Sequence, residues 1–218
     1  MDDPSLDQRR HLQALTALRR VNRVSFGGAR LWAEVRRLHA ATGRPVRVLD
    51  LACGGGDLRA AVARRAEARG VPVELHGCDV SPIAVDETVR AGGGAVQAFA
   101  LDVLHGDLPD DYDLLTASLF LHHLDRSAAV DVLTRMAAAT RHALFVQDLR
   151  RTRAGYALAW LGLHTLTRSD VARKDGLISV RSAFTLPEVY ALCRDAGLAD
   201  AEVGRGWPQR FTVRWERA

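Results

Sequence analysis

Short apolar segments alternate with helical segments through the middle of this chain, and this alternation limits the fold more than any other feature of the sequence. Strands buried on both faces are predicted at residues 46–51, 73–78, 95–101, 114–118 and 143–147. Helices are predicted between them at 57–69, 82–91 and 127–140. Strands that alternate with helices pair in parallel through right-handed crossovers. We therefore expect an α/β fold with a doubly wound, mostly parallel, seven-stranded sheet.

The segments on either side of this core complete a single domain over residues 1–218. Residues 1–44 form a helical preface, in which apolar side chains recur at helical spacing: Leu12, Leu15, Leu18, Leu31, Val35 and Leu38. An interruption is expected there near Ser25, Phe26, Gly27 and Gly28. The core spans 45–150, and a helical insertion spans 151–184, with apolar stretches at 154–164 and 177–183.

The last part of the chain, residues 185–218, carries a helix and two strands. Thr185 and Glu188 have the spacing of a capping box, with Pro187 in the first turn, and Gly197 is expected to end the helix. The two strands are predicted near 201–203 and 211–215.

Composition argues against several other classes of protein. No apolar run reaches the roughly 18 residues of a membrane span, and the start of the chain is acidic and polar, so we expect a cytoplasmic protein. The cysteines Cys53, Cys78 and Cys193 lack metal-type spacing, which predicts no disulfide and no bound metal. The net charge is +4, but the arginines are spread along the chain without an aromatic cluster. We therefore expect no nucleic-acid partner.

A glycine-rich loop at residues 52–56 joins the first strand to the next helix. Backbone without side chains can approach a ligand closely there, and the helix start favours a carboxylate or phosphate. A dinucleotide motif would need a third glycine where Arg59 stands, so a nicotinamide cofactor is disfavoured. Asp50, at the end of the first strand, is suited to hold an amino group. The alternative for the glycine-rich loop is that it forms a tight turn without a role in ligand binding.

This segment resembles motif I of the class I S-adenosylmethionine-dependent methyltransferases, with Ala52 in place of the usual first glycine. We expect alanine to be tolerated provided that the backbone there needs no positive φ. The resemblance implies that Asp79 accepts the ribose hydroxyls and that Asp102 receives the adenine amino group. Helix capping by Asp79 and a plain loop role for Asp102 are the alternatives. The implied cofactor-binding set is Asp50, Ala52, Cys53, Gly54, Gly56, Asp79, Val80, Asp102, Val103 and Ser118.

The residues after the fourth strand bear on the acceptor of the methyl group. The chain lacks the Asn/Asp-Pro-Pro-aromatic run of enzymes that methylate nucleic-acid bases, and its His122-His123 pair resembles methyltransferases that act on hydroxyls of small molecules. A histidine can take the proton of a hydroxyl, and Asp148 at the end of the fifth strand could orient it if the two strands are neighbours. The alternative, that both histidines only pack or contact the cofactor, stays open.

The whole chain also resembles bacterial methyltransferases of the polyketide-tailoring type, in Asn22, Gly27 and Gly28 of the preface and in the segments 148–150 and 181–184. The resemblance implies methyl transfer from S-adenosylmethionine, leaving S-adenosylhomocysteine, to a phenolic hydroxyl of a small, partly apolar molecule. Carbon or nitrogen methylation, and a catalytically silent cofactor-binding protein, are the alternatives. In the family, the insertion at 151–184 often caps the substrate. Its apolar helix suits a pocket wall, a homodimer contact or a foot on a membrane surface, with core packing as the remaining alternative.

Overall fold

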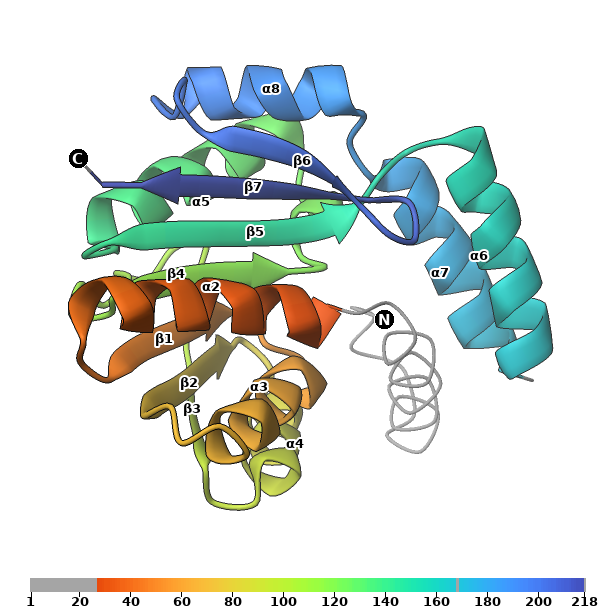
Figure 1. The fold of residues 1–218 in the computed structure, drawn as a ribbon. Coiled ribbons are helices and arrows are strands. Elements are labelled where there is room, and N and C mark those ends of the chain that lie inside the picture. Colours follow the sequence, from red (N-terminus) through yellow and green to blue (C-terminus); the bar gives the residue numbers. More distant parts are fainter. Residues whose placement is uncertain (1–26, 168, 218) are drawn as a thin grey trace.

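A computed structural model describes residues 27–167 and 169–217 and contains one seven-stranded sheet with the order β3-β2-β1-β4-β5-β7-β6 (Figure 1). Strands β1 to β5 run parallel, and β7 runs antiparallel to both of its neighbours. The strands are β1 Val46–Leu51, β2 Val73–Asp79, β3 Val96–Ala100, β4 Leu114–Ser118, β5 Ala143–Leu149, β6 Glu202–Gly206 and β7 Arg210–Glu216. The predicted doubly wound, mostly parallel sheet is confirmed.

Helices cover both faces of this sheet (Figure 1). Apolar residues of α2 and α3 form one core with the sheet, and those of α5 and α8 form a second core on the opposite face. The helices are α2 Gly27–Thr42, α3 Asp57–Glu67, α4 Pro82–Gly92, the 3-10 helix η1 Leu121–His123, α5 Arg126–Ala139, α6 Arg153–Leu166, α7 Asp170–Ser182 and α8 Leu186–Asp195. Residues 1–26 of the predicted preface lie outside the described residues.

The predicted interruption at residues 25–28 is not tested, because residues 25 and 26 lie outside the described residues. The other two, Gly27 and Gly28, stand at the start of α2. Both lie in the first helical turn. A Cβ atom on Gly28 would lie 2.9 Å from the Cβ of Ala61 in α3, closer than packed carbon atoms approach. Gly28 therefore lets α2 and α3 pack closely, a reason for glycine that only the neighbouring helix reveals.

Strand β5 extends two residues past its predicted end at 147. Asp148 pairs with Phe211 and Leu149 pairs with Arg210 on the antiparallel strand β7. Aspartate is uncommon in strands, so the sequence predicted that β5 would end before Asp148. The backbone there instead pairs with strand β7. The extension carries Asp148 to the carboxyl end of the sheet.

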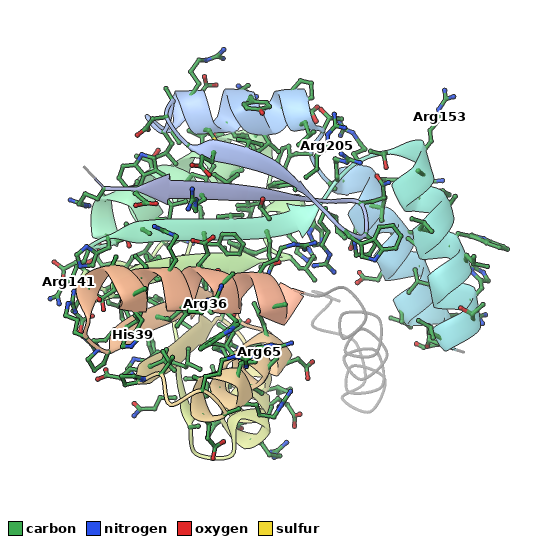
Figure 2. All side chains as sticks on the ribbon, viewed as in Figure 1. Arg36, His39, Arg65, Arg141, Arg153 and Arg205 are labelled. Atoms are coloured by element: carbon green, nitrogen blue, oxygen red, sulfur yellow. The ribbon has the colours of Figure 1, made fainter. Side chains whose placement is uncertain are left out.

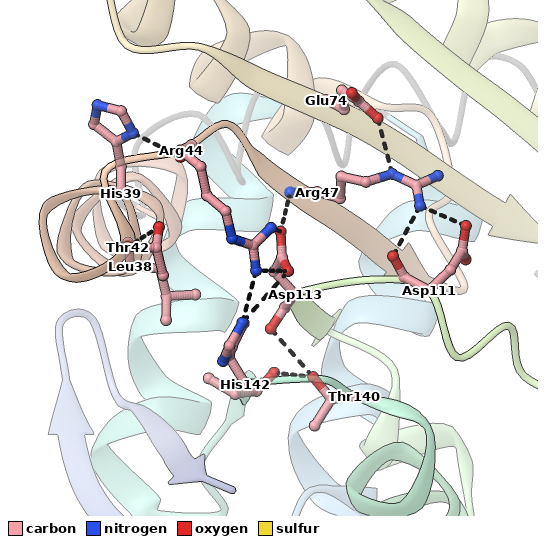
Figure 3. A network of polar contacts seen from close by, with 11 residues as sticks. Leu38, His39, Thr42, Arg44, Arg47, Glu74, Asp111, Asp113, Thr140 and His142 are labelled. Atoms are coloured by element: carbon pink, nitrogen blue, oxygen red, sulfur yellow. Dashed lines mark hydrogen bonds and ion pairs between the residues drawn. The ribbon is translucent and has the colours of Figure 1, made fainter.

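At the amino ends of the parallel strands, polar contacts surround Asp113 (Figure 3). This buried carboxylate accepts hydrogen bonds from Arg44 Nη2 at 2.8 Å and from the backbone N–H of Arg47 at 2.9 Å. Thr140 Oγ1 donates to the carbonyl oxygen of Asp113 at 3.3 Å. Arg47 also holds Asp111, and that hydrogen bond keeps the pKa of Asp111 below its usual value. The network fastens the amino ends of β1, β4 and β5.

The capping box that begins α8 is confirmed. The backbone N–H of Thr185 donates to Glu188 Oε2 at 2.7 Å, and Gly197 follows the helix in the left-handed conformation with φ of 76°. Both features depend on neighbours along the chain, and for this reason the sequence pattern located them.

Basic side chains come from many elements. Those labelled in Figure 2 are Arg36 and His39 from α2, Arg65 from α3, Arg141 before β5, Arg153 from α6 and Arg205 from β6. The basic side chains labelled there thus lie on separate parts of the fold. Across the part of the chain that the structure describes, no helix has both the length and the hydropathy that a membrane crossing requires.

Candidate functional site

The loop between β1 and α3 contains three residues in the left-handed region. Their φ values are 49° at Ala52, 53° at Gly54 and 77° at Gly56. The condition under which we expected alanine to be harmless at position 52 is therefore not met, because a left-handed alanine costs roughly 1–2 kcal/mol. Gly56 has a second reason to be glycine, since its Cβ would lie 2.7 Å from the Cα of Thr88 in α4.

Asp79 connects the end of β2 to this loop. Its Oδ2 accepts the backbone N–H of Gly54 at 2.9 Å, and its Oδ1 accepts the N–H of Ser81 at 3.0 Å. The N-cap of α4 is Ser81 itself, whose hydroxyl accepts the N–H of Ala84. Each carboxylate oxygen can accept a second hydrogen bond, so these contacts leave Asp79 able to bind hydroxyl groups. Val80 beside it is 70% exposed.

Asp50 is buried and forms an ion pair with Arg59, which the sequence did not lead us to expect. Arg59 uses Asp50 Oδ2, while Oδ1 accepts no hydrogen bond from the described residues. Burial raises the pKa of Asp50 to about 6, although the charge of Arg59 opposes the shift. A buried carboxylate oxygen without a donor is suited to the ammonium group of an amino-acid ligand.

The third acid, Asp102, lies in an exposed turn after β3. It accepts the N–H of Leu104 at 2.9 Å and pairs with His105 Nδ1 at 2.8 Å, and the His105 hydrogen bond holds its pKa below the usual value. Val103 beside it is buried. Because β1, β2 and β3 are neighbours in the sheet, the structure brings Asp50, Asp79 and Asp102 to the carboxyl ends of adjacent strands.

The two histidines occupy η1, directly after β4, and they differ in environment. His122 is buried, and its Nδ1 lies 2.6 Å from Asp148 Oδ1, while its backbone N–H donates to Asp148 Oδ2 at 3.1 Å. His123 is exposed, with its ring centroid 4.2 Å from that of His122. Strands β4 and β5 are neighbours, which was the condition for Asp148 to reach a histidine.

Electrostatics favour an ionised Asp148. Burial opposes ionisation, but the charge of His122 and hydrogen bonds from its ring and from the backbone hold the pKa of Asp148 below the usual value. A carboxylate bound to Nδ1 fixes the ring orientation and the proton position of a histidine. Of the two histidines, the structure pairs His122 with this acid.

Leu119 and Gln147 are features of this edge that the sequence did not indicate. Leu119 follows β4 with φ of 58° and donates its N–H to the carbonyl of Gln147 at 3.0 Å. Buried Gln147 donates through Nε2 to Ser118 Oγ and to the carbonyl of Gly27, both at 3.2 Å. Left-handed backbone at a non-glycine residue is uncommon and clusters at functional sites.

The insertion forms a hairpin of α6 and α7, which lies beyond the arrowhead of β5 (Figure 1). The helices pack closely at Gly176, where a Cβ would lie 2.7 Å from Leu163 Cδ1. Of the residues in α6, only Gly155 and Leu163 are buried, which contradicts the core-packing alternative. Exposed apolar side chains on α6 are Leu158, Trp160, Leu161 and Leu166.

A hollow of about 290 Å³ opens between the start of α6 and the end of α7. Its lining residues are Arg151, Thr152, Arg153, Tyr156, Val180 and Arg181. None of them belongs to η1 or to the glycine loop, so we do not assign this hollow to the methyl acceptor. Within residues 27–167 and 169–217, no three histidine, cysteine or acidic side chains are grouped so as to hold a metal ion.

A sheet of this strand order, with a glycine loop after β1 and acids after β2 and β3, defines the fold of the class I S-adenosylmethionine-dependent methyltransferases. A family model described as "Methyltransferase domain" matches residues 48–143, and together with the fold it supports a class I S-adenosylmethionine-dependent methyltransferase. Its cofactor is therefore S-adenosylmethionine. The residues present fit this cofactor, because Asp50 leaves one buried oxygen for its ammonium group and a Cβ on Gly54 would meet no atom within 4 Å.

Known proteins of similar sequence and structure agree with this assignment. Ubiquinone biosynthesis O-methyltransferase of Azotobacter vinelandii is 26% identical over 160 residues, which span 72% of this chain and 66% of that protein. Magnesium protoporphyrin IX methyltransferase of Synechocystis PCC 6803, solved with S-adenosylhomocysteine, has a TM-score of 0.60 at 16% identity and covers 88% and 84% of the two chains. A plantazolicin methyltransferase has a TM-score of 0.71 at 12% identity and covers 93% and 88%. The two structural likenesses concern the fold.

Proposed function

We propose that this protein transfers the methyl group of S-adenosylmethionine to a hydroxyl, of phenolic type, on a small and partly apolar molecule. The observation that carries the proposal is the 2.6 Å contact between His122 Nδ1 and Asp148 Oδ1 at the carboxyl end of β5. A buried carboxylate bound to one ring nitrogen is the arrangement that makes the other nitrogen a proton acceptor. The likeness to an O-methyltransferase supports oxygen as the accepting atom.

In this proposal His122 is the general base, and Asp148 keeps the ring proton on Nδ1 so that Nε2 is the free acceptor. A phenol has a pKa near 10 in water, so it is largely protonated at neutral pH and gains from a base in contact with its hydroxyl. When His122 takes the proton, the ionised Asp148 stabilises the imidazolium. His123 remains the alternative base, with its ring next to that of His122.

The residues proposed to hold the cofactor lie along the carboxyl ends of β1 to β4. Bound S-adenosylmethionine supplies an electrophilic methyl group. Asp50 would accept its ammonium, Asp79 its ribose hydroxyls and Asp102 its adenine amino group. The loop residues and the remaining contacts are Ala52, Cys53, Gly54, Gly56, Val80, Val103 and Ser118.

The hairpin of α6 and α7 is proposed to wall the acceptor site. Its position beyond β5 and the exposed apolar side chains of α6 support this role (Figure 1). Apolar walls with few polar groups are typical of small-molecule sites. A homodimer contact through the same face is the alternative, and sedimentation of the full chain distinguishes the two, because a monomer leaves this face for the acceptor.

Single-turnover methylation at saturating S-adenosylmethionine, over pH 6 to 10, tests the base. With an accepting phenol in hand, His122→Ala should lower the rate by about 10² to 10⁴, and Asp148→Asn should slow the same step. His39→Ala, on α2, is the matched control and should keep the wild-type rate. If His122→Ala and His123→Ala both retain near-full rates, general-base catalysis by this pair is wrong.

A panel of phenols, amines and carbon acids, each incubated with methyl-labelled S-adenosylmethionine, separates the rival functions. Methylation confined to phenols supports the proposal, whereas products from amines or carbon acids alone would replace it with nitrogen or carbon methylation. Cofactor binding without any turnover would favour a silent binding protein. A dependence of S-adenosylhomocysteine affinity on Asp79 tests the cofactor site separately: Asp79→Ala should weaken binding by about 1–3 kcal/mol.

A further inference from the structure

The buried side chain of Arg59 and the hydroxyl of Thr88 meet beneath the glycine loop. We propose that these two residues are positioning residues: they hold the carbonyl groups of the loop in one arrangement and so preform the cofactor site. The inference rests on the proposed binding of S-adenosylmethionine to this loop. Neither residue belongs to the cofactor-binding set, and no pattern in the sequence singled out Thr88.

Arg59 makes three contacts with its guanidinium while fully buried. Its Nη1 pairs with Asp50, and its Nη2 donates to the carbonyl oxygen of Cys53 at 2.9 Å and to Thr88 Oγ1 at 3.2 Å. The side chain comes from the first turn of α3, so one residue joins the end of β1, the loop and α4. A planar guanidinium can serve several acceptors in fixed directions, which a lysine ammonium cannot reproduce.

Thr88 completes the arrangement from α4. Its hydroxyl donates to the carbonyl oxygen of Gly54 at 2.7 Å, accepts from Arg59 at 3.2 Å and lies 3.4 Å from Cys53 Sγ. Two consecutive loop carbonyls, those of Cys53 and Gly54, are therefore bound from below. The N–H of Gly54 is bound to Asp79 at 2.9 Å. The loop is thus fixed on both sides of residue 54, next to the acid proposed for the ribose.

Two glycines make the room that this arrangement needs. A Cβ on Gly77 of β2 would lie 3.0 Å from both Cζ and Nε of Arg59, and one on Gly56 would lie 2.7 Å from the Cα of Thr88. Gly77 lies directly opposite Asp50 in the pairing of β1 with β2. Strand β2 and the glycine loop therefore both leave space, for the guanidinium of Arg59 and for its partner Thr88. An arginine that faces solvent would not need this space.

The loop needs such support because its backbone is strained at Ala52, the one residue of the three left-handed ones that carries a Cβ. Residues 52, 54 and 56 are left-handed, and Ala52 is held there despite its Cβ. Strained backbone persists only when the surroundings over-determine it. If the contacts from Arg59 and Thr88 are lost, the loop gains other conformations, and the cofactor must then select the competent one, which lowers its apparent affinity.

Calorimetric titration of the full-length protein with S-adenosylhomocysteine tests the inference without requiring turnover. Arg59→Lys should weaken binding about tenfold or more, and Thr88→Val about fivefold, since each removes a hydrogen bond to the loop. Thr88→Ser keeps the hydroxyl and should bind within about twofold of wild type. Val62→Ala, a buried change one turn further along α3, is the matched control: it lowers the Tm and should leave affinity within about twofold.

The outcomes separate this inference from the proposed cofactor site. If Asp79→Ala weakens binding but Arg59→Lys and Thr88→Val do not, the cofactor site stands and the positioning role is overturned. If Asp79→Ala has no effect, the cofactor site fails and the positioning role fails with it. If Arg59→Lys does not fold, the difference in affinity for S-adenosylhomocysteine between Thr88→Val and Thr88→Ser decides the question. At saturating S-adenosylmethionine the two variants should recover most of kcat, because the KM for the cofactor carries the change.

Discussion

Replacing Ala52 by glycine should stabilise this protein, although it removes a methyl group. The φ of 49° holds a residue with a Cβ in the left-handed region, at a cost of roughly 1–2 kcal/mol that glycine does not incur. Glycine in turn loses about 0.4–1 kcal/mol through the greater freedom of the unfolded chain. The middle of each range leaves a net gain of about 0.8 kcal/mol, and for a chain of this length that corresponds to a rise in Tm of about 2–3 °C.

Calorimetry and urea unfolding of Ala52→Gly, both without cofactor, measure this gain. Ala33→Gly is the control, because Ala33 is exposed in the middle of α2, where glycine costs about 1 kcal/mol. The two substitutions are chemically identical and should shift the Tm in opposite directions. A Tm for Ala52→Gly at or below that of wild type would refute the reasoning that residue 52 is strained.

Three further predictions concern other parts of the molecule. Burial raises the pKa of Asp50 to about 6, so this acid binds a proton below that pH, and the affinity for S-adenosylhomocysteine should then fall by about tenfold per pH unit. Asp50→Asn should abolish this pH dependence, and a wild-type affinity that stays constant from pH 5 to 7 would contradict the prediction. Asp113→Asn should cost about 1–2 kcal/mol in urea unfolding, since its partner Arg44 is half exposed, and should leave cofactor affinity unchanged because the network lies at the opposite edge of the sheet. Gly28→Val should lower stability by about 1–3 kcal/mol by forcing α2 away from Ala61, and an unchanged Tm would show that the helices can separate freely.

Much of the fold could be predicted from the sequence because its signals are local. The five parallel strands were recognisable as short apolar runs, and two of them, Val46–Leu51 and Leu114–Ser118, begin and end where the pattern indicated. The capping box at Thr185 and the glycine stop at Gly197 involve residues a few positions apart. Such features are set by steric and hydrogen-bonding preferences that act within one turn of the chain.

The candidate site was predicted only in outline. The sequence indicated that acids would follow adjacent strands and that Asp148 could reach a histidine, and the neighbouring positions of β4 and β5 meet the second condition. The sequence could not choose between His122 and His123, because the choice depends on which ring faces the buried carboxylate. Nor did it show that Arg59 is buried, although its spacing of three residues from Val62 on α3 was a usable signal.

The sequence by itself determined the strands, the helices and the glycine loop, since each depends on residues close together in the chain. Only the tertiary structure decided the left-handed conformation of Ala52, the added length of β5 and the pairing of Arg59 with Asp50. These features arise from contacts between elements distant in sequence. The neighbouring strand β7 forms hydrogen bonds with the backbone of β5, and a charge buried away from water is stable only when it is paired with an opposite charge. Packing between elements overrode the local preferences of alanine for negative φ and of arginine for solvent.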